Sequence, residues 1–202
     1  MVVVDFYFDV VSSASYLAYT QLPGIARRCG AKIAWKPMLL GAVLQTTGNQ
    51  GPASIKAKAR WMEADMHRWA KRYGVPFQRN PDFPINSMTL MRGAVGMLAA
   101  GEEEFLKYVD CVMQAMWGKG LNLGIREHMV AVLEAAGFDI RQFDAMVTQP
   151  EVKAALKRNS DEAVERGAFG APTFFVGNEM FWGQDRLDFV EESLRKGISN
   201  SF

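Results

Sequence analysis

The chain has 202 residues, of which 49% are hydrophobic and 22% are charged, and its 23 basic and 22 acidic residues give a formal net charge of +1. This composition is that of a globular protein long enough to bury a core, and the basic residues are too scattered for a nucleic-acid-binding surface. Because the sequence lacks a run of eighteen apolar residues and a basic leader with a cleavage pattern, we expect a soluble, cytoplasmic protein with no membrane or nucleic-acid partner.

A β-α-β unit is predicted at the start of the chain. Residues 2–8 are β-branched and aromatic and precede Asp9, which favours a short buried strand. Residues 12–29 carry apolar side chains at helical spacing, and Pro23 among them predicts a kink or a break. Residues 31–37 alternate between apolar and polar side chains and end at a proline, which indicates a half-buried strand.

Helical patterns dominate from residue 39 to about residue 161. Candidate helices cover residues 55–73, 87–100, 102–117, 125–136, 140–148 and 151–166. Strand character returns in residues 173–176 and 179–182, which are separated by Gly177 and Asn178, a pair typical of a hairpin turn, and a helix containing Leu187 and Val190 follows. The chain is therefore α/β, with a β-α-β unit, a long all-helical segment and a β-β-α unit.

The run Ser12-Ser13-Ala14-Ser15 follows the first strand and opens the first helix. A thioredoxin-like chain carries its redox Cys-x-x-Cys at this place, so serine at both sulfur positions excludes dithiol chemistry here. Cys29 and Cys111 lie elsewhere and are assigned to structure. Serine is also a preferred helix N-cap, and the N-terminus of a helix favours an anion, so Ser12 is interpreted as a residue that holds a thiolate.

Four segments together resemble the 2-hydroxychromene-2-carboxylate isomerases, which belong with kappa-class glutathione transferases and DsbA-like oxidoreductases. They are Asp5-Phe6-Tyr7-Phe8-Asp9, Ser12-x-x-Ser15-Tyr16, Gly170-Ala171-Pro172-Thr173-Phe174 and Trp182-Gly183-Gln184-Asp185-Arg186-Leu187. The resemblance covers nearly the whole chain and implies a thioredoxin-like fold with a large all-helical domain inserted between the β-α-β and β-β-α halves. The implied domains are residues 1–38 plus 162–202 and the insertion 39–161, in a homodimer.

The resemblance also implies a glutathione site. Ser12 would be the catalytic residue that positions and activates the thiolate of glutathione, and Ala171 before Pro172 would pair with its cysteinyl backbone. Gln184 and Asp185 would hold its γ-glutamyl end, although Asp185 followed by Asp188 is also typical of a helix cap. The related isomerases usually have proline where Ser13 stands, so whether Ser12 or Ser13 makes the shorter sulfur contact stays open.

Further polar residues are candidates for holding the carboxylate of an aromatic substrate. The resemblance points to Asn49 in the Gly-Asn loop and to Lys58, with Lys56 as the alternative, and Asn86 is a further candidate. No metal site is expected, because His67 and His128 lack partners at ligand spacing.

The implied activity is glutathione-dependent isomerisation of 2-hydroxychromene-2-carboxylate to trans-o-hydroxybenzylidenepyruvate in naphthalene breakdown. A kappa-like transferase that conjugates glutathione to aromatic electrophiles and a glutathione-binding module without catalysis are the alternatives.

Overall fold

The computed structural model describes residues 1–199, and in this part of the chain four strands form one mixed sheet in the order β2-β1-β3-β4. The strands are β1 (Val3–Phe8), β2 (Lys32–Pro37), β3 (Thr173–Val176) and β4 (Glu179–Trp182). β1 is parallel to β2 and antiparallel to β3, and β3 is antiparallel to β4. The predicted strands and the hairpin are confirmed, and the sheet joins two segments that lie more than 130 residues apart along the chain.

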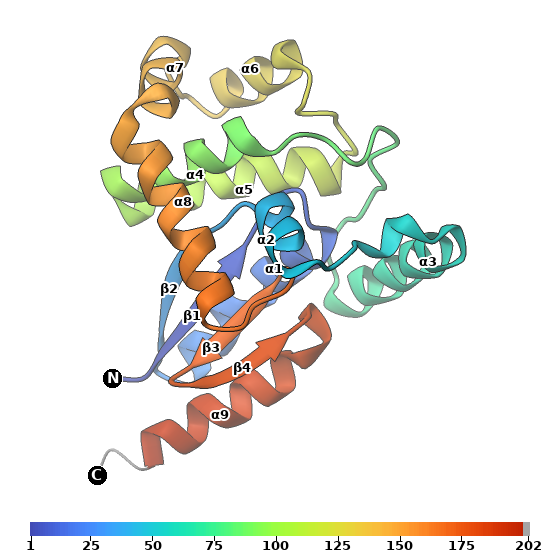
Figure 1. Cartoon of the computed structure of the whole chain (residues 1–202), viewed down its shortest axis with the longest axis vertical. Coiled ribbons are helices and arrows are strands. Elements are labelled where there is room, and N and C mark those ends of the chain that lie inside the picture. Colours follow the sequence, from blue (N-terminus) through green and yellow to red (C-terminus); the bar gives the residue numbers. More distant parts are fainter. Residues whose placement is uncertain (200–202) are drawn as a thin grey trace.

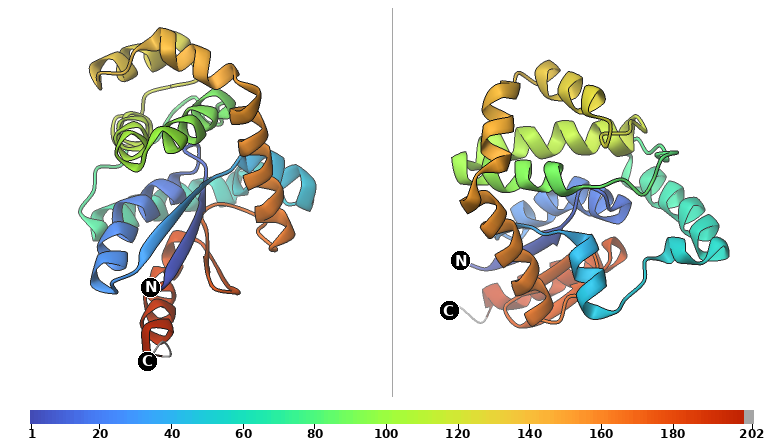
Figure 2. Two further views of the ribbon diagram at one scale, coloured as in Figure 1. Left: turned by 90° about the vertical axis from the view of Figure 1, so that its left-hand side faces the viewer. Right: turned by 45° about the horizontal axis from the view of Figure 1, so that its top comes forward.

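Helices cover both faces of this sheet (Figures 1 and 2). One face packs against α1 (Ser13–Arg28) and α9 (Leu187–Ser199), and the other packs against α2 (Leu40–Thr47) and α8 (Pro150–Glu165). The alternation of β1 explains this arrangement, since Phe6 and Phe8 lie in the large core that includes α1, whereas Tyr7 packs with Val43 of α2 and Ala163 of α8.

The remaining helices lie between β2 and β3 in the chain and form most of the long helical segment. They are α3 (Lys56–Tyr73), α4 (Met88–Ala100), α5 (Glu102–Met113), α6 (Arg126–Ala135) and α7 (Ile140–Thr148), with a 3-10 turn at Pro52–Ser54 and a π-helical turn at Gln114–Gly118. A second 3-10 turn, Gln184–Arg186, lies between β4 and α9. In Figure 1 α4 to α7 stack above the sheet, while α3 lies to one side. These helices and the α/β thioredoxin-like arrangement agree with the prediction.

Two local details differ from the expectations. Of the kink or break predicted at Pro23, the break does not occur: α1 is continuous through Pro23, because Leu17, Leu22 and Ile25 on either side of the proline are buried in the core. The helix α2 begins at Leu40 without a side-chain cap from its own N-cap residue Leu39, and so the sequence carries no local start signal for it.

The proposed boundary between residues 161 and 162 falls inside α8, which contacts α4 and α7 as well as α2 and β2. The domain division therefore remains a prediction. Among residues 1–199, no helix combines the length and the apolar character needed to cross a membrane.

Candidate active site

Ser12 lies at the N-terminus of α1, against the loop that leads into β3. Its backbone is extended, with φ −89° and ψ 115°, and its Oγ accepts a hydrogen bond from Ser15 N at 3.1 Å. The same hydroxyl donates to Ala171 O at 3.2 Å, and the residue is 9% exposed. Ser12 is thus a helix cap and also contacts Ala171, the residue before Pro172. The resemblance implies that both Ser12 and Ala171 contact a bound glutathione.

The other two serines of the motif differ in their surroundings. Ser13 is the first residue of α1 and is half-buried. Ser15 is fully buried, and its Oγ has no hydrogen-bond partner among the described residues. A buried hydroxyl without a partner is uncommon in proteins, so the first turn of α1 retains one unused polar group beside Ser12.

The loop at Pro172 is tied directly to the turn before α9. The Ala171–Pro172 peptide bond is cis, as is Phe83–Pro84. Pro172 O accepts a hydrogen bond from Gly183 N at 3.0 Å. Through this bond, the structure brings Ser12, Ala171 and Pro172 together with the Gln184–Arg186 turn.

Gln184 and Asp185 have opposite environments within this turn. Gln184 is 3% exposed, and the Tyr73 hydroxyl from the end of α3 lies 2.8 Å from its Oε1 and 3.2 Å from its backbone oxygen. The Asp185 side chain is 42% exposed, and its Oδ2 pairs with Arg186 at 2.9 Å. A Cβ on Gly183 would come within 2.5 Å of Asp185 Oδ1, so glycine is needed there, also because its φ is +103°. The Asp185 carboxylate is therefore accessible to a ligand cation. The buried Gln184 side chain is instead held by its hydrogen bond from the Tyr73 hydroxyl.

Asn49 is joined to the same region, and the other substrate candidates are not. Its Nδ2 donates to Phe169 O at 2.7 Å, two residues before Ala171. Lys56 and Lys58 are exposed in the first turn of α3 and form no ion pair with another residue in the range 1–199. Asn86 is exposed, and its Oδ1 accepts a hydrogen bond from Met88 N at 2.9 Å at the start of α4. The described contacts link none of these last three residues to the Ser12 loop.

Asp9 and Tyr73 belong to this site although neither is among the predicted site residues. Asp9 is fully buried and accepts hydrogen bonds from Val11 N at 3.0 Å, Leu40 N at 2.9 Å and Ser87 Oγ at 2.9 Å. Burial raises the pKa of Asp9 to about 6. The position of Asp9, between a buried strand and the Ser12 turn, could have marked it as a site residue. Nothing near Tyr73 in the sequence indicates that its hydroxyl contacts Gln184.

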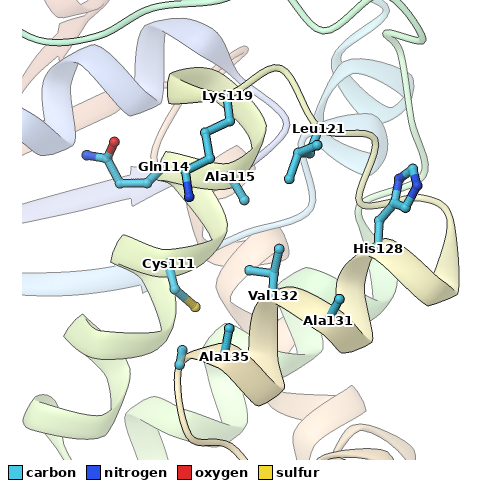
Figure 3. A pocket seen from close by; sticks show the side chains of 10 residues that line it. Cys111, Gln114, Ala115, Lys119, Leu121, His128, Ala131, Val132 and Ala135 are labelled. Carbon is cyan, nitrogen blue, oxygen red and sulfur yellow. The ribbon is translucent and has the colours of Figure 1, made fainter.

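Neither cysteine offers a reactive thiol at this site. Cys29 is buried, and burial raises the pKa of Cys111 to about 12, so that the Cys111 thiol is protonated at neutral pH. Cys111 lines a pocket of about 390 Å³ between the π-helical turn and α6, together with Lys119, His128 and Val132 (Figure 3). This pocket shares no lining residue with the site at Ser12. Within residues 1–199, no group of His, Cys, Asp and Glu is arranged to hold a metal ion.

Comparison with known proteins identifies the family. A family model described as a DsbA-like thioredoxin domain matches residues 3–195. A 2-hydroxychromene-2-carboxylate isomerase of Sphingobium xenophagum is 33% identical over 193 residues, which make up 95% of this chain and 97% of that protein. Glutathione S-transferase kappa 1 of Caenorhabditis elegans is 26% identical over 207 residues, covering 96% of this chain and 91% of that one.

A solved structure of a 2-hydroxychromene-2-carboxylate isomerase matches with a TM-score of 0.85 and 30% identity over 99% of this chain and 100% of that one. Sequence and fold agree along essentially the whole length. The chain therefore belongs to the DsbA-like thioredoxin family and, within it, to the family of the 2-hydroxychromene-2-carboxylate isomerases.

Proposed function

We propose that the protein is a glutathione-dependent isomerase that converts 2-hydroxychromene-2-carboxylate to trans-o-hydroxybenzylidenepyruvate, a step of naphthalene breakdown. The observation that carries the proposal is the contact between the Ser12 hydroxyl and Ala171 O in a chain that has serine at both cysteine positions of the redox motif. With no thiol of its own at the start of α1, the protein depends on the sulfur of a bound cofactor.

The residues present fit glutathione. The unpartnered buried hydroxyl of Ser15 and the Ser12 hydroxyl flank the N-terminus of α1, where an anion is favoured. Ala171 lies before β3 and offers its carbonyl to an extended peptide. The open carboxylate of Asp185 suits the γ-glutamyl ammonium, and the nearby backbone of Gln184 suits the carboxylate. The Gln184 side chain, held by Tyr73, supports the shape of this turn.

Ser12 has one hydroxyl proton, and in this structure it is given to Ala171 O. Ser12 and the N-terminus of α1 would hold the sulfur of bound glutathione, which would supply a thiolate for reversible addition to the conjugated double bond of the open substrate. Ser12 can donate its proton to the sulfur only after releasing Ala171 O, which is then free to accept a backbone N–H of the tripeptide. This exchange leaves the number of satisfied polar groups unchanged and gives the thiolate a charge-assisted hydrogen bond.

The substrate carboxylate needs a cation or an amide. Lys56 and Lys58 lie in the first turn of α3, which contains no acidic residue, so two positive charges add to the positive end of the helix dipole. Lys58 is the proposed carboxylate partner and Lys56 its alternative. Asn49 and Asn86 are the proposed amide partners. Of the two, Asn49 is the one hydrogen-bonded to the loop that contains Ala171, through Phe169 O.

The test is turnover by the purified protein, with 2-hydroxychromene-2-carboxylate as substrate and the trans product measured by chromatography. Conversion that needs reduced glutathione and leaves its concentration unchanged is the expected result. Rapid conjugation of glutathione to an electrophilic aromatic halide without chromene turnover would instead identify a transferase related to the kappa class, to which the chain is also similar.

A third outcome is that the protein binds glutathione but catalyses neither the isomerisation nor the conjugation. This result would identify it as a glutathione-binding module without catalysis. A homodimer in the cytoplasm is also part of the proposal, and light scattering of the purified protein tests the dimer.

A further inference from the structure

Asp9 is a carboxylate buried without a cation. It follows β1, is 0% exposed, and takes part in no ion pair among residues 1–199. Its hydrogen bonds come from two backbone N–H groups, of Val11 and Leu40, and from the hydroxyl of Ser87. Burying an unpaired carboxylate is strongly unfavourable, so another source of positive potential must compensate.

Three helices begin at this carboxylate. Leu40 is the first residue of α2, Ser87 is the N-cap of α4, and Val11 lies two residues before the start of α1. Neither α2 nor α4 has a side-chain cap of its own, and the Ser87 hydroxyl donates to Asp9 instead of capping α4. The N-terminus of each helix carries a partial positive charge, so the three ends together act as the missing cation.

One of these three ends is the site proposed for the thiolate. Ser12 N donates to Asp9 O at 3.0 Å, and Ser12 Oγ caps α1. A bound thiolate and the Asp9 carboxylate would therefore share the positive N-terminus of α1. Burial raises the pKa of Asp9 only to about 6, so the carboxylate is ionised above pH 7.

We propose, on the basis of the proposed function, that Asp9 is a built-in anion that opposes ionisation of the thiol bound beside Ser12. The carboxylate does not touch the sulfur and acts through the electrostatic potential at the start of α1. Since the nucleophilicity of a thiolate falls with the pKa of its thiol, this opposition keeps the sulfur reactive enough for reversible addition. The same carboxylate fixes α2 and α4 to the Ser12 turn.

The size of the effect follows from the separation. The backbone between Asp9 and Ser12 spans at most about 10 Å. For a carboxylate and a thiolate separated by about 10 Å, an effective dielectric constant of about 20 gives a pKa shift of about one unit. Loss of the Asp9 charge should lower the pKa of the bound thiol by about this amount. Loss of a purely structural residue would loosen the site and raise the thiol pKa toward that of free glutathione.

The experiment is a titration of the thiolate absorbance of the protein–glutathione complex at about 240 nm, after calorimetry has established binding. Asp9→Asn should lower the bound-thiol pKa by about one unit. Asp9→Ser removes the same charge while its hydroxyl can still accept from Val11 N, and it should act in the same direction if the first variant does not fold. Asp139→Asn is the matched control, because Asp139 caps α7 through Arg141 N and Gln142 N far along the chain, and it should leave the thiol pKa unchanged.

An unchanged or raised thiol pKa in a folded Asp9 variant that binds glutathione would overturn this inference and leave the proposed function intact. Absence of glutathione binding by the unsubstituted protein would overturn both.

Discussion

Lowering the pH from 7 to 5 should stabilise the protein more than it stabilises the Asp9→Asn variant. The pKa of Asp9 is about 6 in the folded protein and 3.8 in a free chain, so the folded state binds the proton more tightly. The free energy of unfolding therefore rises as the pH falls through 6, and the contribution of Asp9 is complete below its unfolded pKa of 3.8.

The linkage relation gives the magnitude. For these two pKa values, the free energy of unfolding at pH 5 exceeds that at pH 7 by about 1.3 kcal/mol from Asp9 alone, and for a chain of this length the corresponding rise in melting temperature is about 3–5 °C. Other carboxylates do not obscure the comparison. Hydrogen bonds from Arg28 and Arg126 hold the pKa values of Glu191 and Asp144 below their usual values, and these groups are present in both proteins.

Urea unfolding followed by tryptophan fluorescence at pH 5, 6 and 7 measures the difference. The unsubstituted protein and Asp139→Asn should share the same pH dependence, and Asp9→Asn should lack about 1.3 kcal/mol of it. If all three proteins change equally with pH, Asp9 does not titrate in this window and the argument from its burial is refuted.

The proposed site leads to three further predictions. Ser12→Ala should lower turnover about 10- to 100-fold, because a charge-assisted hydrogen bond is lost, whereas Ser13→Ala should cost less than threefold, and equal losses in steady-state assays would show that the two hydroxyls share the thiolate. Lys58→Ala should raise KM for the carboxylate substrate several-fold with little change in kcat, and a larger effect of Lys56→Ala would transfer the role to that residue. Asp185→Asn should weaken glutathione binding about fivefold in calorimetry, and unchanged affinity would remove Asp185 from the site.

The parts of the fold that could be predicted depend on local patterns. The aromatic and β-branched run of β1 and the Gly177–Asn178 turn each give their signal within a few residues. The contact of Ser12 with Ala171 spans 159 positions and was not itself predicted. The four motifs, which together imply a known fold, predicted only that both residues belong to one glutathione site. Periodicity alone would have left Ser12 as an ordinary helix cap.

The missed features depend on partners far away in the sequence. α2 starts where Asp9, 31 residues earlier, accepts the N–H of Leu40, so no capping residue precedes it. Tyr73 meets Gln184 across 111 positions, because α3 ends beside the turn before α9. In both cases the feature depends on a hydrogen bond between residues far apart in the chain. Local sequence patterns do not contain such contacts, so neither feature could be predicted from them.

A crystal structure of the protein with reduced glutathione tests whether the reactive thiolate is held at the start of α1. We predict that the sulfur lies within hydrogen-bond distance of Ser12 Oγ, that the Ser12 hydroxyl no longer donates to Ala171 O, and that the cysteinyl backbone pairs with Ala171. A sulfur bound elsewhere, with the hydrogen bond between Ser12 and Ala171 intact, would contradict the claim that the reactive thiolate is held at the start of α1.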